Sequence, residues 1–334
     1  MDKNLTNFDC NLHIKLSNQE SIKGIIHISH GMGEHIGRYK WLIKNLNNDG
    51  YHVISNDHRG HGTKITDFSS QGYFSNSQGF KKVSDDLVDL VDIVNSNYPD
   101  INQYMIAHSM GSWISLSALI DNMKIDGLIL SGSGYISKHI IIMQCIALNI
   151  SEFFYGDKSE SLLMHKITFE NYNNYFKPTN TNSDWISSDS DSVGDYEADP
   201  LCGFKSKINL WKNMTKIFLR VFKSSSYKKV NKNLPIYIIS GAEDPVGGFG
   251  KNVKKLFLFL SKIFSNVRLD IIENARHEVF SETNKQKSYN KVINFLESIW
   301  SDLYYLFFLL SQFLLMLKIW RELTFFMKMK VDII

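Results

Sequence analysis

The stretch Gln103-Tyr-Met-Ile-Ala-His-Ser-Met-Gly111 decides the fold of this chain. Its first half is apolar, as in a buried strand, and apolar side chains recur at helical spacing in the residues that follow it. No residues are left between strand and helix for a loop, so the chain must turn sharply around Ser109. Such a turn lifts the serine hydroxyl above the edge of the sheet and directs the Met110 N–H to the same place.

Segments with strand and helix patterns alternate on both sides of this turn. Strand patterns occur at 11–16, 24–29, 51–56, 126–132, 234–240 and 267–272, and helical patterns at 38–46, 80–97, 250–262 and 285–299. This alternation predicts an α/β fold with a mostly parallel central sheet flanked by helices.

The alternation stops between about residues 135 and 229. An apolar helical pattern covers 136–154, a stretch rich in Asn, Ser and Asp covers 171–195, and an amphipathic pattern covers 208–222. We therefore expect an inserted helical cap. The predicted organisation is a core in two parts, 1–134 and 230–300, the cap at 135–229 and a hydrophobic C-terminal tail at 301–334.

Composition excludes several classes of protein. The chain has 334 residues, of which 43% are hydrophobic, so it is globular rather than disordered. The net charge of +3 is too balanced to indicate a nucleic-acid partner. Cys10, Cys145 and Cys202 are spread too widely for a disulfide framework or a metal site, and the first twenty residues are polar. We expect a cytoplasmic protein without a metal.

Three residues with complementary chemistry each follow a predicted strand. Ser109, Asp244 and His277 occur in the order nucleophile, acid, base. A serine hydroxyl needs a base to take its proton, and His277 needs a carboxylate to fix its tautomer and stabilise its cation. Each residue alone could be structural, but all three at strand ends in this order favour catalysis.

A glycine-rich turn at 30–37 follows the strand pattern of 24–29. Such a turn leaves backbone N–H groups free, so the N–H of Met32 can join that of Met110 in binding an oxyanion. The turn can equally be a plain connection to the next helix.

At this point the sequence resembles a known family. The motifs His30-Gly-Met-Gly-Glu-His-Ile-Gly-Arg-Tyr39, Asn56-Asp-His-Arg-Gly-His-Gly62, His108-Ser-Met-Gly111 and Asp199-Pro-Leu-Cys-Gly-Phe204 are similar to those of the monoacylglycerol lipase and lysophospholipase branch of the α/β-hydrolases, with a serine aminopeptidase S33-type domain. The chain departs from the pattern at Ala107, where glycine is commoner, and at Ile36. The resemblance implies a mobile cap over an acyl tunnel and no cofactor.

The expected function is therefore cleavage of carboxylic esters of single-chain lipids, monoacylglycerols or lysophospholipids, through a Ser-His-Asp triad and an acyl-enzyme. Two alternatives stay open. An aminopeptidase of the same fold would need an acidic pocket for the substrate amine, which the acidic residues near 184–199 allow. A non-catalytic membrane-associated scaffold would keep the fold without an activated serine.

The tail carries a second expectation. Residues 303–317 contain no charge, and Lys318, Arg321, Lys328 and Lys330 follow them. Fifteen residues fall short of the roughly 20 that span a bilayer, so contact with a lipid surface is favoured over spanning.

Truncation after Ser301 tests this role of the tail. An uncharged stretch rich in Leu and Phe must find a lipid surface or a protein groove, and the basic residues beyond it are attracted to anionic headgroups. The truncated protein should move from the membrane pellet to the supernatant in a sedimentation assay and keep its turnover of a soluble short-chain ester. Unfolding on truncation would instead make the tail part of the core.

Overall fold

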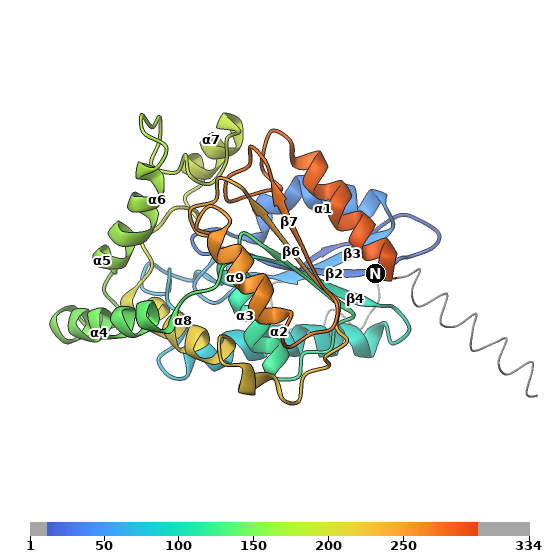
Figure 1. The fold of residues 1–334 in the computed structure, drawn as a ribbon, viewed down its shortest axis with the longest axis horizontal. Coiled ribbons are helices and arrows are strands. Elements are labelled where there is room, and N and C mark those ends of the chain that lie inside the picture. The colour runs from blue at the N-terminus through green and yellow to red at the C-terminus, as the bar shows by residue number, and fades with distance from the viewer. Residues whose placement is uncertain (1–11, 300–334) are drawn as a thin grey trace, which may run out of the picture. The chain divides into compact units, whose positions relative to one another are not determined.

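The computed structural model describes residues 12–299, and its centre is a seven-stranded sheet (Figure 1). The strand order is β1-β3-β2-β4-β5-β6-β7, and only β1 runs antiparallel to its neighbour. The strands are β1 Leu12–Lys15, β2 Gly24–Ser29, β3 Tyr51–Asn56, β4 Gln103–His108, β5 Gly127–Ser131, β6 Ile236–Gly241 and β7 Val267–Ile272. The predicted α/β class is confirmed.

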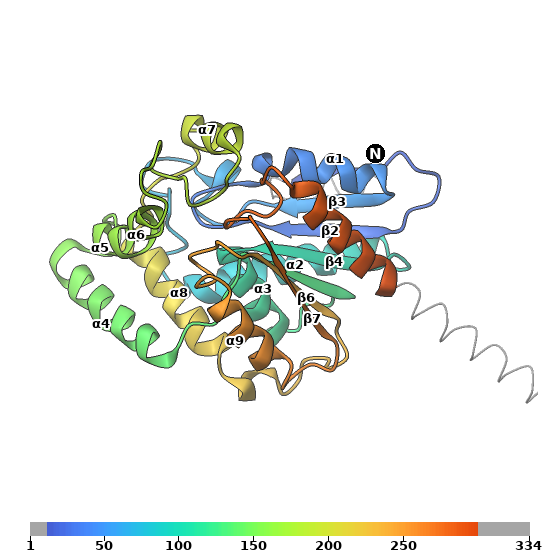
Figure 2. The same cartoon turned by 45° about the horizontal axis from the view of Figure 1, so that its top comes forward.

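Helices cover both faces of the sheet. Figure 2 shows α1 (Lys40–Asn48) on one face and α2 (Gly79–Asn97), α3 (Met110–Ile120) and α9 (Lys251–Leu260) on the other. A further helix covers 285–299. β2 to β6 are fully buried, as expected for strands of a parallel sheet that is covered on both faces. The largest apolar cluster lies between β4, β5, β6 and helices α2, α3 and α9.

The segment between β5 and β6 holds the remaining helices on one side of the sheet (Figure 1). They are α4 Lys138–Tyr155, α5 Leu162–His165, α6 Asn171–Asn174, α7 Ser190–Ala198 and α8 Ile208–Val221. The inner face of α4 packs against α8, and α8 in turn packs against α3 and α2 of the core. The boundaries of a cap at 135 and 229 stay predictions.

Residues 12–289 belong to one compact unit, and the described residues 290–299 belong to a second. Cys10 and the tail at 301–334 lie outside the described residues. Within residues 12–299, no helix has both the length and the apolar character needed to cross a bilayer.

The turn between β4 and α3 depends on a close backbone approach. Ser109 lies there with φ 48° and ψ −119°, a conformation that costs energy for a residue with a side chain. Its N–H donates to the Ser131 carbonyl at 2.9 Å, which holds the turn against β5. A Cβ atom at Gly111 would lie 2.1 Å from the Ser29 carbonyl oxygen, so only glycine lets α3 start this close to β2.

Gly111→Ala should destabilise the protein by at least about 2 kcal/mol, because backbone atoms of β2 cannot yield as a flexible side chain would. Gly194→Ala is the matched control, since a Cβ at that helical position meets nothing within 4 Å. The control should be neutral or stabilising by up to about 1 kcal/mol. Chemical unfolding of both variants measures the difference, and equal stabilities would contradict the close approach.

Candidate active site

The three residues predicted to act together lie at the carboxyl ends of three parallel strands. Ser109 follows β4, Asp244 lies three residues after β6, and His277 lies five residues after β7. Because these strands run parallel within one sheet, their carboxyl ends share one edge.

Asp244 and His277 form a buried hydrogen-bonded pair. The Nδ1–H of His277 donates to Oδ1 of Asp244 at 3.0 Å, and both side chains are almost fully buried. The Val246 N–H donates to the same carboxylate. Burial by itself raises the pKa of Asp244, but the charge of His277 and these hydrogen bonds outweigh it and lower the pKa. Burial likewise lowers the pKa of His277, and Asp244 reverses this effect and raises the pKa.

Ser109 is half-buried, and one glycine lies close to it and another close to His277. A Cβ at Gly31 would lie 3.3 Å from Cβ of Ser109, and one at Gly132 would lie 2.9 Å from Cε1 of His277. Within residues 12–299, the Ser109 hydroxyl forms no hydrogen bond to His277. Such bonds often tighten only when substrate is bound.

Two backbone N–H groups are candidates to bind an oxyanion. Met110 is the first residue of α3, where a backbone N–H has no partner within the helix. The N–H of Met32 donates to no other backbone group within the described part of the chain. Met32 belongs to the loop after β2, and the residue before it, Gly31, lies next to Ser109.

A buried ionic network holds this loop. The guanidinium of Arg38 pairs with Glu278 through two hydrogen bonds of 2.6 and 2.9 Å and reaches Glu34 at 3.1 Å. Glu34 also accepts from the Gly31 N–H and the Tyr39 hydroxyl. Burial by itself raises the pKa of Glu34, but neighbouring positive charges and hydrogen bonds lower it to about 2. The four-residue spacing of Glu34 and Arg38 was visible in the sequence, whereas Glu278, 240 residues away, was not.

Two further rings enclose His277, and the sequence did not identify them. His108 lies against it with ring centroids 4.6 Å apart, and Trp185, between α6 and α7, lies at 4.9 Å. Burial lowers the pKa of His108 to about 4, so this second imidazole is neutral at physiological pH. Of these two imidazoles, His277 is therefore the one that can take up a proton near physiological pH.

A cavity of about 780 Å³ opens next to His108. Its wall combines apolar and charged side chains and is formed by the loop after β2 and the start of α1, by α7 and by the segment after His277. The charged groups on this wall include Glu34, Arg38, Glu278, Asp191 and Asp195.

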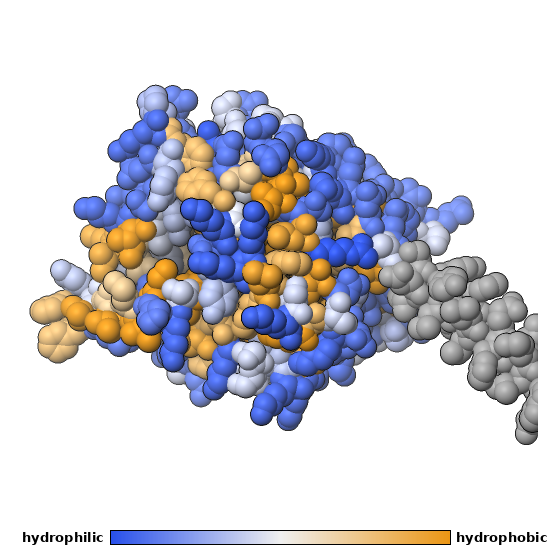
Figure 3. All heavy atoms as spheres, viewed as in Figure 1, coloured by the Kyte–Doolittle hydropathy of each residue, from blue (hydrophilic) through white to orange (hydrophobic). Residues whose placement is uncertain are grey.

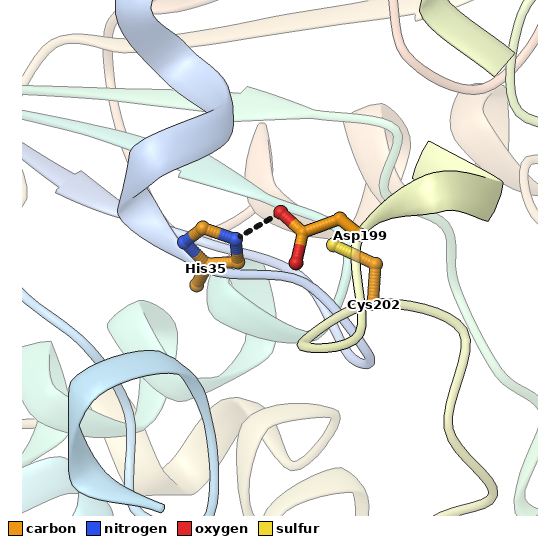
Figure 4. A group of neighbouring side chains, drawn as sticks. All are labelled: His35, Asp199 and Cys202. Atoms are coloured by element: carbon orange, nitrogen blue, oxygen red, sulfur yellow. Dashed lines mark hydrogen bonds and ion pairs between the residues drawn. The ribbon is translucent and has the colours of Figure 1, made fainter. Parts of the chain in front are cut away.

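His35, Asp199 and Cys202 form a small cluster between the loop after β2 and the segment after α7 (Figure 4). Their donor atoms lie within 4.8 Å of one another, as a metal would require. However, Nδ1 of His35 accepts from the Gly37 N–H at 3.1 Å, so Nε2 carries the proton that is donated to Asp199 at 2.9 Å. Burial also raises the pKa of the Cys202 thiol. The cluster therefore fits a hydrogen-bonded link better than a metal site.

Comparison with known proteins agrees with this arrangement of sheet and turn. The family model described as "Serine aminopeptidase, S33" matches residues 20–284. The chain belongs to this family of α/β-hydrolases, in its monoacylglycerol lipase-like branch.

Three known proteins illustrate the relationship. A monoglyceride lipase homolog of monkeypox virus is 28% identical over 79% of this chain and 85% of its own. The structure of a thermostable carboxyl esterase from Bacillus coagulans, in complex with glycerol, shares 26% identity with a TM-score of 0.78, covering 86% of this chain and 93% of that one. A monoglyceride lipase from Saccharomyces cerevisiae, at 21% identity and TM-score 0.68 over 86% and 91%, shares the fold. The chain is a carboxylic-ester hydrolase.

Glu34→Gln tests the ionic network. Because the pKa of Glu34 is lowered in the folded protein from 4.5 to about 2, its contribution is present above pH 4.5 and is lost as the pH falls toward 2. The variant should lose about 3 kcal/mol at pH 7 and show a shallower fall in stability below pH 4.5.

Glu197→Gln, at an exposed position of α7, is the control. It should change neither the free energy of unfolding at pH 7 nor the fall in stability below pH 4.5. Urea unfolding at several pH values measures them. A Glu34→Gln protein as stable as the parent at pH 7 would contradict the network's role.

Proposed function

We propose that the chain cleaves carboxylic esters of single-chain lipids, monoacylglycerols or lysophospholipids, with Ser109 as nucleophile, His277 as base and Asp244 as the acid that orients it. The observation that carries this proposal is the buried hydrogen bond between Asp244 and His277 at the same sheet edge as the strained turn of Ser109. The names of the relatives support the class of substrate.

In the proposed mechanism, His277 Nε2 takes the proton of Ser109 as Oγ attacks the ester carbonyl carbon. The N–H groups of Met32 and Met110 stabilise the negative charge that develops on the carbonyl oxygen. His277 then returns the proton to the leaving alcohol. Water, deprotonated by His277, then attacks the acyl carbon. The bond from this carbon to Oγ breaks, which releases the fatty acid, and His277 passes its proton to Oγ and so restores the Ser109 hydroxyl.

The two ends of such a substrate fit different surroundings. The Met32 side chain packs against an apolar cluster of the inserted segment, formed by Leu148, Met164, Ile208 and Trp211. We infer that this cluster faces the acyl chain and that residues 135–229 act as a cap over it. The cavity beside His108, which several charged side chains line, suits the alcohol or headgroup. We further infer that the tail at 301–334 contacts a lipid surface.

The aminopeptidase reaction is the second candidate, and one observation favours it. Asp189, Asp191 and Asp195 line the cavity beside His108, where they could bind a protonated substrate amine. A hydrolysis panel separates the candidates: monoacylglycerol and lysophosphatidylcholine for the first, aminoacyl amides for the second. Turnover of the amides alone would replace the lipid proposal, and no turnover of any ester or amide would support a non-catalytic scaffold.

Ser109→Ala should lower ester turnover by at least about 10⁴-fold, because it removes the nucleophile and nothing else. Asp244→Asn should cost a comparable factor and also change the pH profile. His277 must be neutral to act as base, and Asp244 raises its pKa above 6.5, so kcat/KM of the parent should rise with a midpoint above pH 6.5.

In Asp244→Asn the charge that raises the pKa of His277 is gone, so the midpoint of the residual activity should move to lower pH. Circular dichroism of both variants verifies that they are folded. Near-normal turnover in Asp244→Asn would mean that another carboxylate orients His277, with Glu243 and Asp57 the first to test.

The dependence of kcat/KM on acyl-chain length tests the lipid assignment. If the apolar cluster behind Met32 faces the acyl chain, kcat/KM should increase along a series of glycerol monoesters from acetyl to decanoyl, because each added methylene buries more apolar surface. A preference for acetyl over decanoyl esters would refute the acyl pocket and, with it, the lipid assignment.

A further inference from the structure

A groove of about 560 Å³ lies between β1 and α1, and we call it the β1–α1 groove. β1 and the loop after it form one wall, and α1 with the residues just before it forms the other. The groove shares Gly37 and Lys40 with the cavity beside His108, but none of the three proposed catalytic residues lines it. Its volume is within the range of pockets that bind small molecules.

The floor of the β1–α1 groove is apolar. Ile36 and Ile43 contribute buried side chains, which are 1% and 9% exposed. Leu16, which is 40% exposed, adds a third apolar side chain. An alkyl chain in the groove would cover the exposed part of Leu16, and the removal of apolar surface from water stabilises such a complex.

Three lysines surround this floor, and they are Lys15, Lys40 and Lys44. All three are exposed, and none of them forms an ion pair within residues 12–299. No Asp or Glu is among the described residues that line the groove. Unpaired charges of one sign around a concave surface raise the local concentration of ions of the opposite sign. The groove therefore suits an occupant that carries a negative charge.

His13 connects the groove with the loop that carries Met32. Its Nε2–H donates to Oδ2 of Asp57 at 2.9 Å, and Asp57 is fully buried and does not line the groove. The other oxygen of Asp57, Oδ1, accepts from the Ile36 N–H at 2.9 Å. Because His13 and Ile36 both line the groove, an occupant would contact the residues that hold this loop in place.

The shape of the groove favours a small molecule over a large partner. Figure 3 shows exposed apolar surface gathered at the edge where Figure 1 places α4, and α1 lies away from that edge in Figures 1 and 2. The groove is thus a separate concavity and not part of a broad apolar face. A broad apolar face suits a protein or a lipid surface, whereas a concavity suits a single dissolved molecule.

The reaction of the chain supplies an anion with an apolar part. A carboxylic-ester hydrolase releases a carboxylic acid, which is ionised at neutral pH. The cavity beside His108 is lined by six carboxylates and three cationic side chains, so a second negative charge is disfavoured there. The β1–α1 groove has the opposite charge and lies close by, since Gly37 and Lys40 line both.

We propose that the β1–α1 groove binds a fatty acid as its carboxylate, at a site separate from the one where the ester is cleaved. The alkyl chain lies on the floor of Leu16, Ile36 and Ile43, and the carboxylate lies among the three lysines. The length of the alkyl chain rests on the proposed lipid substrate, whereas the carboxylate follows from ester hydrolysis itself.

The test is titration calorimetry of the full chain with laurate, below its micelle concentration and at mildly alkaline pH. Lys15→Glu/Lys44→Glu should weaken binding at least about fivefold, because two attractions become two repulsions. The matched control is Lys251→Glu/Lys254→Glu, which makes the same change in net charge at exposed positions of α9 and should bind as the parent does. Circular dichroism verifies that both variants are folded. Unchanged binding of laurate by the groove variant would overturn the proposal.

A second measurement locates the alkyl chain. A fatty acid with a diazirine on its chain should crosslink to peptides from 12–19 and 36–48, which line the groove. Crosslinks confined to residues 135–229 would place the acid in the proposed acyl pocket and overturn the proposal. Leu16→Asn should weaken laurate binding at least about threefold, because it removes apolar surface from the floor. Leu258→Asn, at an exposed position of α9, is its control and should bind as the parent does.

The remaining outcomes separate this proposal from other occupants and from the proposed function. If a chain that begins at Leu12 binds laurate and the full chain does not, residues 1–11 occupy the groove and the proposal fails. If the full chain binds laurate in the groove but hydrolyses no lipid ester, the site stands and the substrate assignment fails. Hydrolysis of lipid esters without laurate binding in the groove would be the reverse result.

Discussion

The contact between the start of α3 and the end of β2 is the constraint on which the rest of the site depends. Gly111 lets the helix backbone approach the Ser29 and His30 carbonyl groups more closely than any side chain permits. That approach forces Ser109 into its positive-φ conformation and leaves the Met110 N–H free at the same point. The loop after β2, which carries Met32, is thereby held against the serine.

The second constraint is electrostatic and connects this loop with the inserted segment. Glu34 and Arg38 hold the loop from within, and Arg38 also extends to Glu278, the residue after His277. The guanidinium lies over the Tyr196 ring of α7 at 4.7 Å, and His35 donates to Asp199. The loop that carries Met32, the loop that carries His277 and the segment between β5 and β6 are therefore joined through one network. A movement of the segment between β5 and β6 would therefore displace the loop that carries Met32.

Much of the fold could be predicted from the sequence because the relevant signals are local. Apolar runs of strand length and the absence of a loop around Ser109 are sufficient to predict the parallel sheet and the sharp turn. Asp244 and His277 could also be predicted as site residues, because each follows a strand pattern. The structure brings these two side chains within hydrogen-bonding distance. The packing of His108 and Trp185 on His277 could not be predicted, because it depends on how the inserted segment folds back. Nor could the pairing of Arg38 with Glu278, since nothing in either local sequence identifies the partner.

The central claim is that Ser109 is activated by the buried pair of Asp244 and His277. Reaction of the full chain with a fluorophosphonate, followed by peptide mapping, tests it most directly, because only an activated serine reacts quickly with such a reagent. We predict a single phosphonylated residue, Ser109, with labelling abolished in His277→Ala. Labelling of another serine, or none in the folded parent, would contradict the account.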